Sequence, residues 1–274
     1  MLLLNGERRH CVDVSDRGFQ YGDGLFETVE VLNGKPLFFD RHLKRLAEGC
    51  RLLSIPCLDP ELLEAEARQL SADAEHGVLK LIVTRGSGGR GYRPPSVATP
   101  TRLFNLHSYP LYPEDFQLSG IRARLCQRRL AINPDLARIK HLNRLEQVLA
   151  RAEWQDDYQE GLMLDRQGRV IEGTMSNLFW VADGRLYTPT IKDCGIAGIV
   201  RGLLIELAEA DGIVVDEVLA DVAELERAEE IFVTNSVIGV WPVKQLDGRD
   251  LGIGAVTRRL QTLYAAARDA EAKA

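Results

Sequence analysis

Two short segments carry residues whose types could do chemistry together. In IKHLNRLEQVL, residues 139–149, Lys140 stands alone just ahead of a stretch with helical periodicity. In EGTMSNLF, residues 172–179, Glu172 is followed by small and polar residues that interrupt an apolar strand. A lysine amine can form a Schiff base with a carbonyl compound, and an ionised carboxylate can pair with a protonated ring nitrogen. For each residue alone, a solvated surface position is the commoner alternative.

One cofactor would need both of these groups together with a phosphate-binding element. Pyridoxal phosphate (PLP) requires a lysine for its aldehyde and an acidic partner for its pyridinium nitrogen. GIAGIVRG, residues 195–202, opens a helix without an acidic residue, and free N–H groups at such an end bind phosphate. A Gly-rich helix start is usually only a cap, however, and Arg45 on an upstream helix would by default be a solvated residue.

The composition narrows the class of protein. The chain has 274 residues, a formal net charge of −6 and five cysteines without a C-x-x-C pair. Because no basic stripe offsets the negative charge, we expect no nucleic-acid partner. We also expect reduced thiols and no metal site. No segment approaches the roughly 20 apolar residues of a membrane helix, and the apolar run at the N-terminus is too short for a secretory signal. We therefore expect a soluble, cytoplasmic protein.

The hydrophobic pattern predicts two α+β domains, 1–110 and 114–274, joined by a linker that contains Pro110 and Pro113. Helices are expected near 40–53, 58–75, 142–156, 198–212 and 254–270, with strands between them. The first helix should bury Leu43, Leu46, Ala47, Cys50 and Leu53.

The helix expected at 142–156 bears on the position of Lys140. Leu142, Leu145, Val148 and Leu149 recur at helical spacing and would form its buried face. On that interpretation, Lys140 lies at the interior edge of the second domain rather than in open solvent.

Three further patterns identify a family. The chain carries E-x-x-x-x-N-L-F from Glu172 to Phe179, the pair Tyr187-Thr188, and G-I-x-R from Gly198 to Arg201. It thus resembles fold-type IV PLP enzymes, which include branched-chain aminotransferases, D-amino acid aminotransferases and 4-amino-4-deoxychorismate lyases. VSDRGFQYGDGLFETV, VLKLIVTRGSGGRGYRP and IKHLNRLEQVLAR resemble the lyases most, and the resemblance runs from Asn5 to about Val243.

The resemblance implies a two-domain fold like that of D-amino acid aminotransferase. In such a fold a smaller N-terminal and a larger C-terminal α/β domain hold PLP between them, in a homodimer. Lys140 would form the Schiff base and Glu172 would face the ring nitrogen. Thr28 would act at the departing oxygen, and Asn143 would contact the 3-oxygen of the ring. The groups expected at the phosphate are Arg45, the backbone of Ile199 and Val200, and Ser236.

Residues that bind the substrate carboxylates are less determined by the motifs. Arg85 and Arg90, in the TRGSGGRGYRP loop, could donate to them, with a solvated loop as the alternative. Tyr92 and Tyr109 could line the pocket, with plain packing as the alternative.

The implied reaction converts 4-amino-4-deoxychorismate into 4-aminobenzoate and pyruvate, a step of folate biosynthesis. The lysine binds the cofactor, a proton is abstracted, and the enolpyruvyl ether is eliminated. A class-IV aminotransferase of the D-amino acid or branched-chain type is the chief alternative. Glu27, which many aminotransferases share, slightly favours it, whereas Thr28 favours the lyase. A non-catalytic protein on the same fold is a second alternative.

Overall fold

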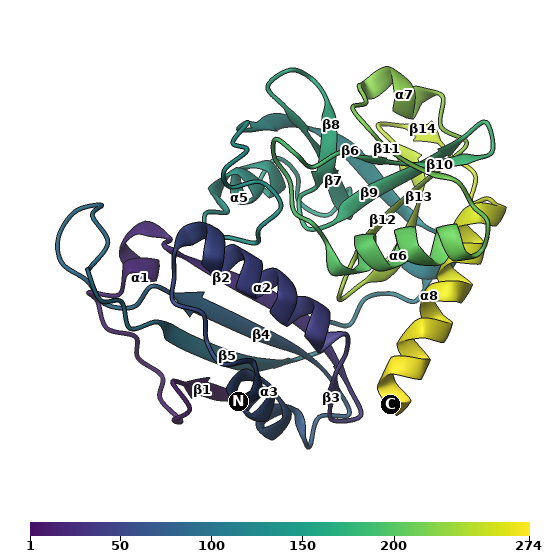
Figure 1. The fold of residues 1–274 in the computed structure, drawn as a ribbon. Coiled ribbons are helices and arrows are strands. Elements are labelled where there is room, and N and C mark those ends of the chain that lie inside the picture. Colours follow the sequence, from purple (N-terminus) through teal and green to yellow (C-terminus); the bar gives the residue numbers. More distant parts are fainter. The chain divides into compact units, whose positions relative to one another are not determined.

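The structure, a computed structural model, describes residues 1–274 and divides into two compact units (Figure 1). The first unit comprises Met1–Pro110, Ile139–Asn143 and Glu271–Ala274, and the second comprises Leu111–Arg138 and Arg144–Ala270. The predicted α+β class is confirmed, because each unit combines its own sheet with helices. The short segment that carries Lys140, assigned by the sequence to the second domain, belongs to the first unit.

The first unit is built on a five-stranded antiparallel sheet in the order β1-β5-β4-β2-β3. Its strands are β1 (Leu2–Leu4), β2 (Gly24–Leu32), β3 (Lys35–Pro36), β4 (His76–Thr84) and β5 (Thr101–Ser108). The Asn33-Gly34 turn between β2 and β3 has positive φ at both residues, 50° and 80°, as a tight hairpin requires.

Three helices complete the first unit: α1 (Arg17–Tyr21), α2 (Phe39–Leu53) and α3 (Pro60–Ser71). Helix α3 lies within the helix expected at 58–75. It starts at Pro60 with Asp59 as its N-cap, whose carboxylate accepts from Glu61 N at 3.0 Å. Helix α2 lies close on β2, because a Cβ at Gly49 would come within 2.8 Å of the Leu25 side chain. His42 and Gly49 of α2 are buried whereas Ala47 is exposed, so the predicted buried face was partly wrong.

The second unit contains a nine-stranded sheet. The main path runs β11-β10-β9-β12-β13-β6-β7-β8, and an additional β8–β9 pairing closes a ring of six strands. The closure joins Glu172 of β8 to Asn177 of β9. The strands are β6 (Ile121–Leu130), β7 (Glu160–Asp165), β8 (Val170–Gly173), β9 (Asn177–Ala182), β10 (Arg185–Pro189), β11 (Val215–Val218), β12 (Glu230–Asn235), β13 (Gly239–Leu246) and β14 (Arg249–Asp250).

Five helices belong to this second part of the chain: α4 (Asp115–Leu118), α5 (Leu145–Arg151), α6 (Ile199–Ala210), α7 (Val222–Glu226) and α8 (Ala255–Lys273). Helix α8 starts one residue later and ends three residues later than the helix expected at 254–270. Helix α6 closely matches the helix expected at 198–212. None of the eight helices in the chain could cross a bilayer on length and hydropathy. All five cysteines are unpaired.

The expected helix at 142–156 is shorter, and its predicted buried face is wrong. Leu145, Val148 and Leu149 are 74, 59 and 51% exposed, whereas Ala150 on α5 is fully buried. The helix cannot start before Leu145, because the preceding residues form an extended segment along β2, with bonds from Phe26 N to Lys140 O and from Leu142 N to Gly24 O. Lys140 is therefore positioned by a strand edge and not by a helix.

Candidate cofactor site

Lys140 lies beside the start of β2 within the first unit. Its main-chain oxygen accepts from Phe26 N at 2.9 Å, and His141 forms an antiparallel bridge with Leu25. The Lys140 Nζ lies over the Phe26 ring, 4.5 Å from the ring centroid. A cation over an aromatic face is attracted by the ring. The hydrogen-bonded edge of β2 thus fixes the backbone of Lys140, and Phe26 guides its amine.

Thr28 is on the same side of β2 as Phe26, because side chains two residues apart on a strand share a face. It is half-buried and pairs directly with Lys80 of β4. The Lys80 Nζ also lies over the Phe26 ring, at 5.4 Å from the centroid. Two amines therefore lie over one aromatic ring, and Thr28 is on the same face of the strand as that ring. Lys80 was not identified from the sequence. Only the pairing register of β2 with β4 places it opposite Thr28.

On the other side of β2, Glu27 forms a buried cluster with His42 and Arg45 of α2. Arg45 Nε donates to Glu27 Oε1 at 2.9 Å and Arg45 Nη2 to Oε2 at 2.5 Å, while His42 Nδ1 lies 2.6 Å from Oε2. Burial opposes the charge on Glu27, but the Arg45 cation and the His42 hydrogen bond outweigh it and lower the pKa of Glu27 to about 2. Burial lowers the pKa of His42 against the pull of Glu27.

Asn143, the expected contact of the ring 3-oxygen, is exposed at the end of the same extended segment. Its Nδ2 donates to Gly22 O at 3.1 Å. Gly22 has φ 66°, and a Cβ there would come within 2.7 Å of Asn143 Oδ1. The chain therefore bends tightly at Gly22, and the Asn143 amide is the group that approaches the bend.

Glu172, at the end of β8 in the second unit, is a buried carboxylate. Its Oε2 accepts from Ile196 N at 2.8 Å, and Asn177 Nδ2 donates to Ile196 O at 2.9 Å. Glu172 and Asn177 therefore bind the same peptide segment from its two sides. Arg144 is within electrostatic range as well, because burial lowers its pKa while Glu172 raises it. Arg144 lies in the quoted lysine motif but was not singled out there.

The strand ends around Glu172 bring the phosphate candidates together. Asn177 pairs with Glu172 on one side and with Thr234 of β12 on the other. Ser236 follows Thr234 by two residues and is half-buried. A Cβ on Gly198 would lie only 1.9 Å from Asn177 Oδ1, so the start of α6 touches the same strand end. Glu172, Ser236 and the first residues of α6 thus converge within one unit.

The start of α6 is suited to an anion. Its N-cap, Gly198, has no side-chain capping bond, and the first turn has no acidic residue. Ile199 and Val200 are buried, and their N–H groups form no hydrogen bond within the chain. Buried N–H groups without an acceptor are costly, and a phosphate would satisfy them. The residues present therefore fit the phosphate end of PLP, and Glu172 fits its ring nitrogen.

Glu160 of β7 supports this site and was missed by sequence reasoning. It is fully buried and accepts from Thr174 Oγ1 and Ser176 Oγ at 2.6 Å each. It also accepts from the N–H groups of Gly161, Thr174 and Met175. The carboxylate therefore holds the turn that links Glu172 to β9. The small polar residues after Glu172 were the available signal, and they serve Glu160.

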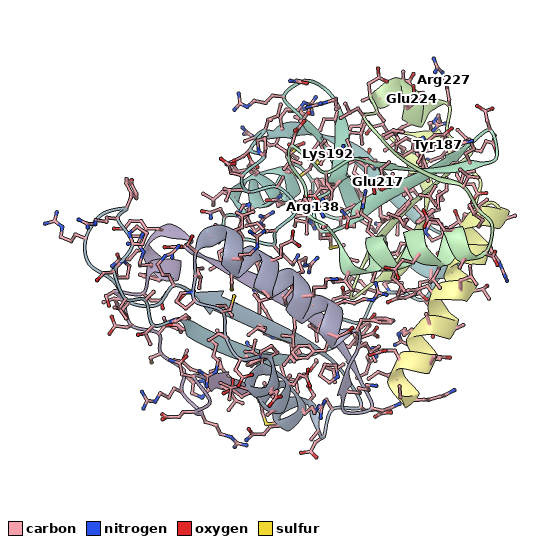
Figure 2. The ribbon with its side chains drawn as sticks, in the orientation of Figure 1. Arg138, Tyr187, Lys192, Glu217, Glu224 and Arg227 are labelled. Atoms are coloured by element: carbon pink, nitrogen blue, oxygen red, sulfur yellow. The ribbon has the colours of Figure 1, made fainter.

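Arg138 precedes this region with an unusual backbone. Arg138, which is labelled in Figure 2, is the last residue of the second unit before the segment Ile139–Asn143. Its φ is 75°, and this left-handed conformation is unfavourable for any residue other than glycine. Its N–H donates to Gly195 O at 2.8 Å and its C=O accepts from Ala197 N at 3.0 Å. Arg138 thereby fixes the loop whose Ile196 N–H binds the Glu172 carboxylate.

The expected substrate-binding residues lie in the first unit, and Arg85 is engaged internally. Arg85 Nε and Nη2 donate to the two carboxylate oxygens of Asp23 at 2.7 and 2.9 Å. Its Nη1 and Nη2 donate to Ser54 O and Leu53 O, both at 2.8 Å, at the end of α2. Arg85 is therefore buried and bound to Asp23 and to the end of α2, so the solvated-loop alternative was wrong. Its role at a substrate carboxylate stays a prediction.

The other three candidates are dispersed. Arg90 is exposed, and Tyr92 is 86% exposed with its ring edge against Tyr21. Tyr109 stacks on His76 with ring centroids 3.6 Å apart. Tyr109 thus packs against a neighbouring side chain, and the roles of Tyr109, Arg90 and Tyr92 at the substrate stay predictions.

The second unit also contains a cavity of about 510 Å³. Trp180, Tyr187, Glu224 and Arg227 contribute to its wall, and Figure 2 shows the last three near α7. Trp180 is three residues along β9 from Asn177, which corresponds to about 10 Å of strand. The cavity contains none of the groups that fit PLP, so it is separate from the site around Glu172.

Comparison with known proteins places the chain in a family. The family model "Amino-transferase class IV" matches residues 24–246. Aminodeoxychorismate lyase of Vibrio harveyi is 36% identical over 95% of this chain and 98% of its own. D-alanine aminotransferase of Bacillus licheniformis is 31% identical over 95% and 94%. The crystal structure of 4-amino-4-deoxychorismate lyase from Pseudomonas aeruginosa superposes with a TM-score of 0.93, at 48% identity over 96% and 97% of the two chains. The expected fold type is confirmed, and the chain belongs to the class IV aminotransferase family.

Proposed function

We propose that this chain is a PLP-dependent lyase that converts 4-amino-4-deoxychorismate into 4-aminobenzoate and pyruvate. The observation that carries the proposal is the position of Thr28, a hydroxyl on the face of β2 where Phe26 guides the Lys140 amine. The similarity to lyases of two organisms over nearly the whole chain supports it.

The cofactor would be held by groups already described. Lys140 would hold its aldehyde, and Glu172, which accepts from Ile196 N–H, would hold the ring nitrogen in its protonated form. The N–H groups of Ile199 and Val200 bind its phosphate, with Ser236 and Arg45 as further donors. When bound, PLP supplies a sink for the electron pair left at the carbon that loses a proton. Asn143 is proposed to contact the 3-oxygen.

Two side chains of the first unit would act on the substrate. The Lys140 amine would remove the proton from the amine-bearing carbon of the substrate. The C–O bond to the enolpyruvyl group then breaks, and the electron pair from the C–H bond completes the aromatic ring. Thr28 donates a hydrogen bond to the departing oxygen, which leaves as enolpyruvate and becomes pyruvate.

A class-IV aminotransferase is the second candidate, because it needs the same lysine and glutamate. The specific observations that favour it are Glu27 and the similarity to D-alanine aminotransferase. An aminotransferase returns its cofactor to the starting state with a keto acid, whereas the elimination requires none. The two reactions are therefore distinguishable by the demand for an acceptor.

The test is to incubate the purified protein and PLP with 4-amino-4-deoxychorismate and to follow 4-aminobenzoate without any keto acid. The lyase proposal expects product in catalytic amounts, and no product from Lys140→Ala. Thr28→Gly should reduce turnover at least tenfold while PLP affinity stays unchanged, and Thr28→Ser, which keeps the hydroxyl, should retain activity. Product that appears only after addition of a keto acid would support the aminotransferase instead.

We further propose that the enzyme is a cytoplasmic homodimer in which residues of one subunit complete the site of the other. Arg90 and Tyr92, exposed on the loop after β4, are the residues proposed to serve the substrate in that way. A monomeric mass in light scattering of the active enzyme would rule out this arrangement.

A further inference from the structure

Glu27 is a charged group that the proposed reaction does not use, although it is almost completely buried. Only 1% of its surface is exposed, and its neighbours on the same face of β2, Leu25 and Val29, are core residues. An ionised carboxylate in such surroundings is costly unless charge and hydrogen bonds compensate it. The compensation comes from α2 alone, through His42 and Arg45.

The contact between Glu27 and Arg45 is a bidentate one. Two N–H groups of the guanidinium point at two different oxygens of one carboxylate, which fixes the plane of the guanidinium as well as its position. Glu27 thus orients the guanidinium through two of its N–H donors. Arg45 is 9% exposed, so the side chain is enclosed and has little freedom to reorient.

His42 secures the geometry from a second direction. It lies three residues before Arg45 on α2 and therefore on the same face of the helix. Burial lowers the pKa of His42, so the ring is neutral and donates its Nδ1–H to Glu27 at 2.6 Å. Glu27 is thus held by one neutral donor, and Arg45 is the cation that balances its charge.

The same strand also positions Lys140. The residue immediately before Glu27 is Phe26, whose N–H binds Lys140 O and whose ring lies under the Lys140 amine. Residues 26 and 27 of β2 therefore fix, on adjacent positions, the amine proposed for the aldehyde and the guanidinium proposed for the phosphate. In a rigid strand this sets the spacing of the two groups before any cofactor arrives.

We propose that Glu27 is a positioning residue for the cofactor phosphate, acting through Arg45. The inference rests on the proposed function and extends it to a residue that contacts neither cofactor nor substrate. A long side chain normally loses rotamer freedom when it binds a ligand. Glu27 has already removed that freedom, so the phosphate meets an oriented donor. The alternative is that the pair merely attaches α2 to β2.

The discriminating experiment compares two ligands that differ only in the phosphate. The apo-protein is titrated with PLP and with pyridoxal, and the lysine-bound chromophore is followed by absorbance. The variants are Glu27→Gln, which loses the second acceptor oxygen, and Glu27→Asp, which keeps the charge on a shorter side chain. Glu66→Gln is the matched control, because Glu66 binds Arg102 in the same unit through an equally bidentate contact.

Both Glu27 variants should bind PLP at least about tenfold more weakly than the wild type, the size of one charge-assisted hydrogen bond. Their affinity for pyridoxal should be unchanged, and inorganic phosphate should compete less well with PLP. The control should bind both ligands like the wild type. If Glu27→Gln does not fold, Glu27→Asp carries the test alone.

Equal losses for PLP and pyridoxal, or the same pattern in Glu66→Gln, would show a merely structural role and overturn the inference. Unchanged or tighter PLP binding would do so as well, because removal of a negative charge should by itself favour a phosphate. A wild type that forms no borohydride-reducible bond with PLP would instead defeat the proposed function, and the inference with it.

Discussion

The buried Glu27 cluster makes the stability of the first unit depend on pH in a calculable way. In the folded chain the carboxylate has both a cationic partner and a neutral donor, which it lacks when unfolded. Glu27→Gln removes the charge but preserves the size of the side chain. Arg45 is then a buried cation with only a single acceptor oxygen opposite, so we expect the free energy of unfolding to fall.

The magnitude follows from the pKa of Glu27, which drops from an ordinary value of 4.5 to about 2. At about 1.4 kcal/mol for each pH unit, this difference corresponds to about 3 kcal/mol. Because the folded-state pKa is the lower one, this stability is present above pH 4.5. It is lost as the pH falls from 4.5 towards 2, where both states become protonated. The wild type should therefore exceed Glu27→Gln by about 3 kcal/mol at pH 7 and by almost nothing near pH 2.

Urea unfolding of the apo-proteins between pH 2 and pH 8, followed by far-UV circular dichroism, measures this difference. All three tryptophans, Trp154, Trp180 and Trp241, lie in the second unit. Tryptophan fluorescence therefore reports that unit separately and shows whether the loss is confined to the first. The reasoning is refuted if the two proteins are equally stable at pH 7, or if their difference persists unchanged down to pH 2.

Three further predictions concern the second unit, each measured as a change in unfolding free energy. Gly198→Ala should destabilise the protein by more than 1 kcal/mol, because the new Cβ would meet Asn177 Oδ1 at 1.9 Å. Gly202→Ala lies near the start of the same helix with open space around it and should stabilise the protein by about 0.5–1 kcal/mol. Equal effects of the two substitutions would contradict the packing at Gly198. Ser176→Ala should cost about 1.5–3 kcal/mol, because it removes a hydroxyl bonded to a buried carboxylate at 2.6 Å, and a loss below 0.5 kcal/mol would show that this bond is dispensable. Arg138→Gly should gain about 1 kcal/mol by relieving the positive φ of 75°, while Arg138→Ala should gain nothing; a gain in both would point to the guanidinium instead of the backbone.

Local sequence was sufficient wherever a structure depends on neighbouring residues. Asp59 before Pro60 supplies both a cap and a fixed φ, and so the start of α3 could be predicted to the residue. The Asn33-Gly34 turn could be predicted because both residues tolerate positive φ. The motifs around Glu172 and Gly198 likewise indicated a carboxylate and a phosphate-binding helix start. They did not indicate that Asn177 contacts both segments.

Contacts between distant segments could not be predicted in this way. The helical spacing of Leu145, Val148 and Leu149 indicated a buried face, but packing of α5 through Ala150 leaves those leucines and the valine exposed. Arg85 looked like a loop cation until its contacts with Asp23 and the end of α2 were known.

The sequence by itself determined the chemical groups of this protein, a lysine, a glutamate and an uncapped helix start, together with the family to which they belong. Only the tertiary structure decided that Lys140 is held at the edge of β2, and that Glu27 and Glu160 are buried carboxylates that orient other groups. The physical reason is that a side chain's partner depends on strand register and helix packing. Both are set by the free energy of the whole unit and are not recorded in the spacing of residues along the chain.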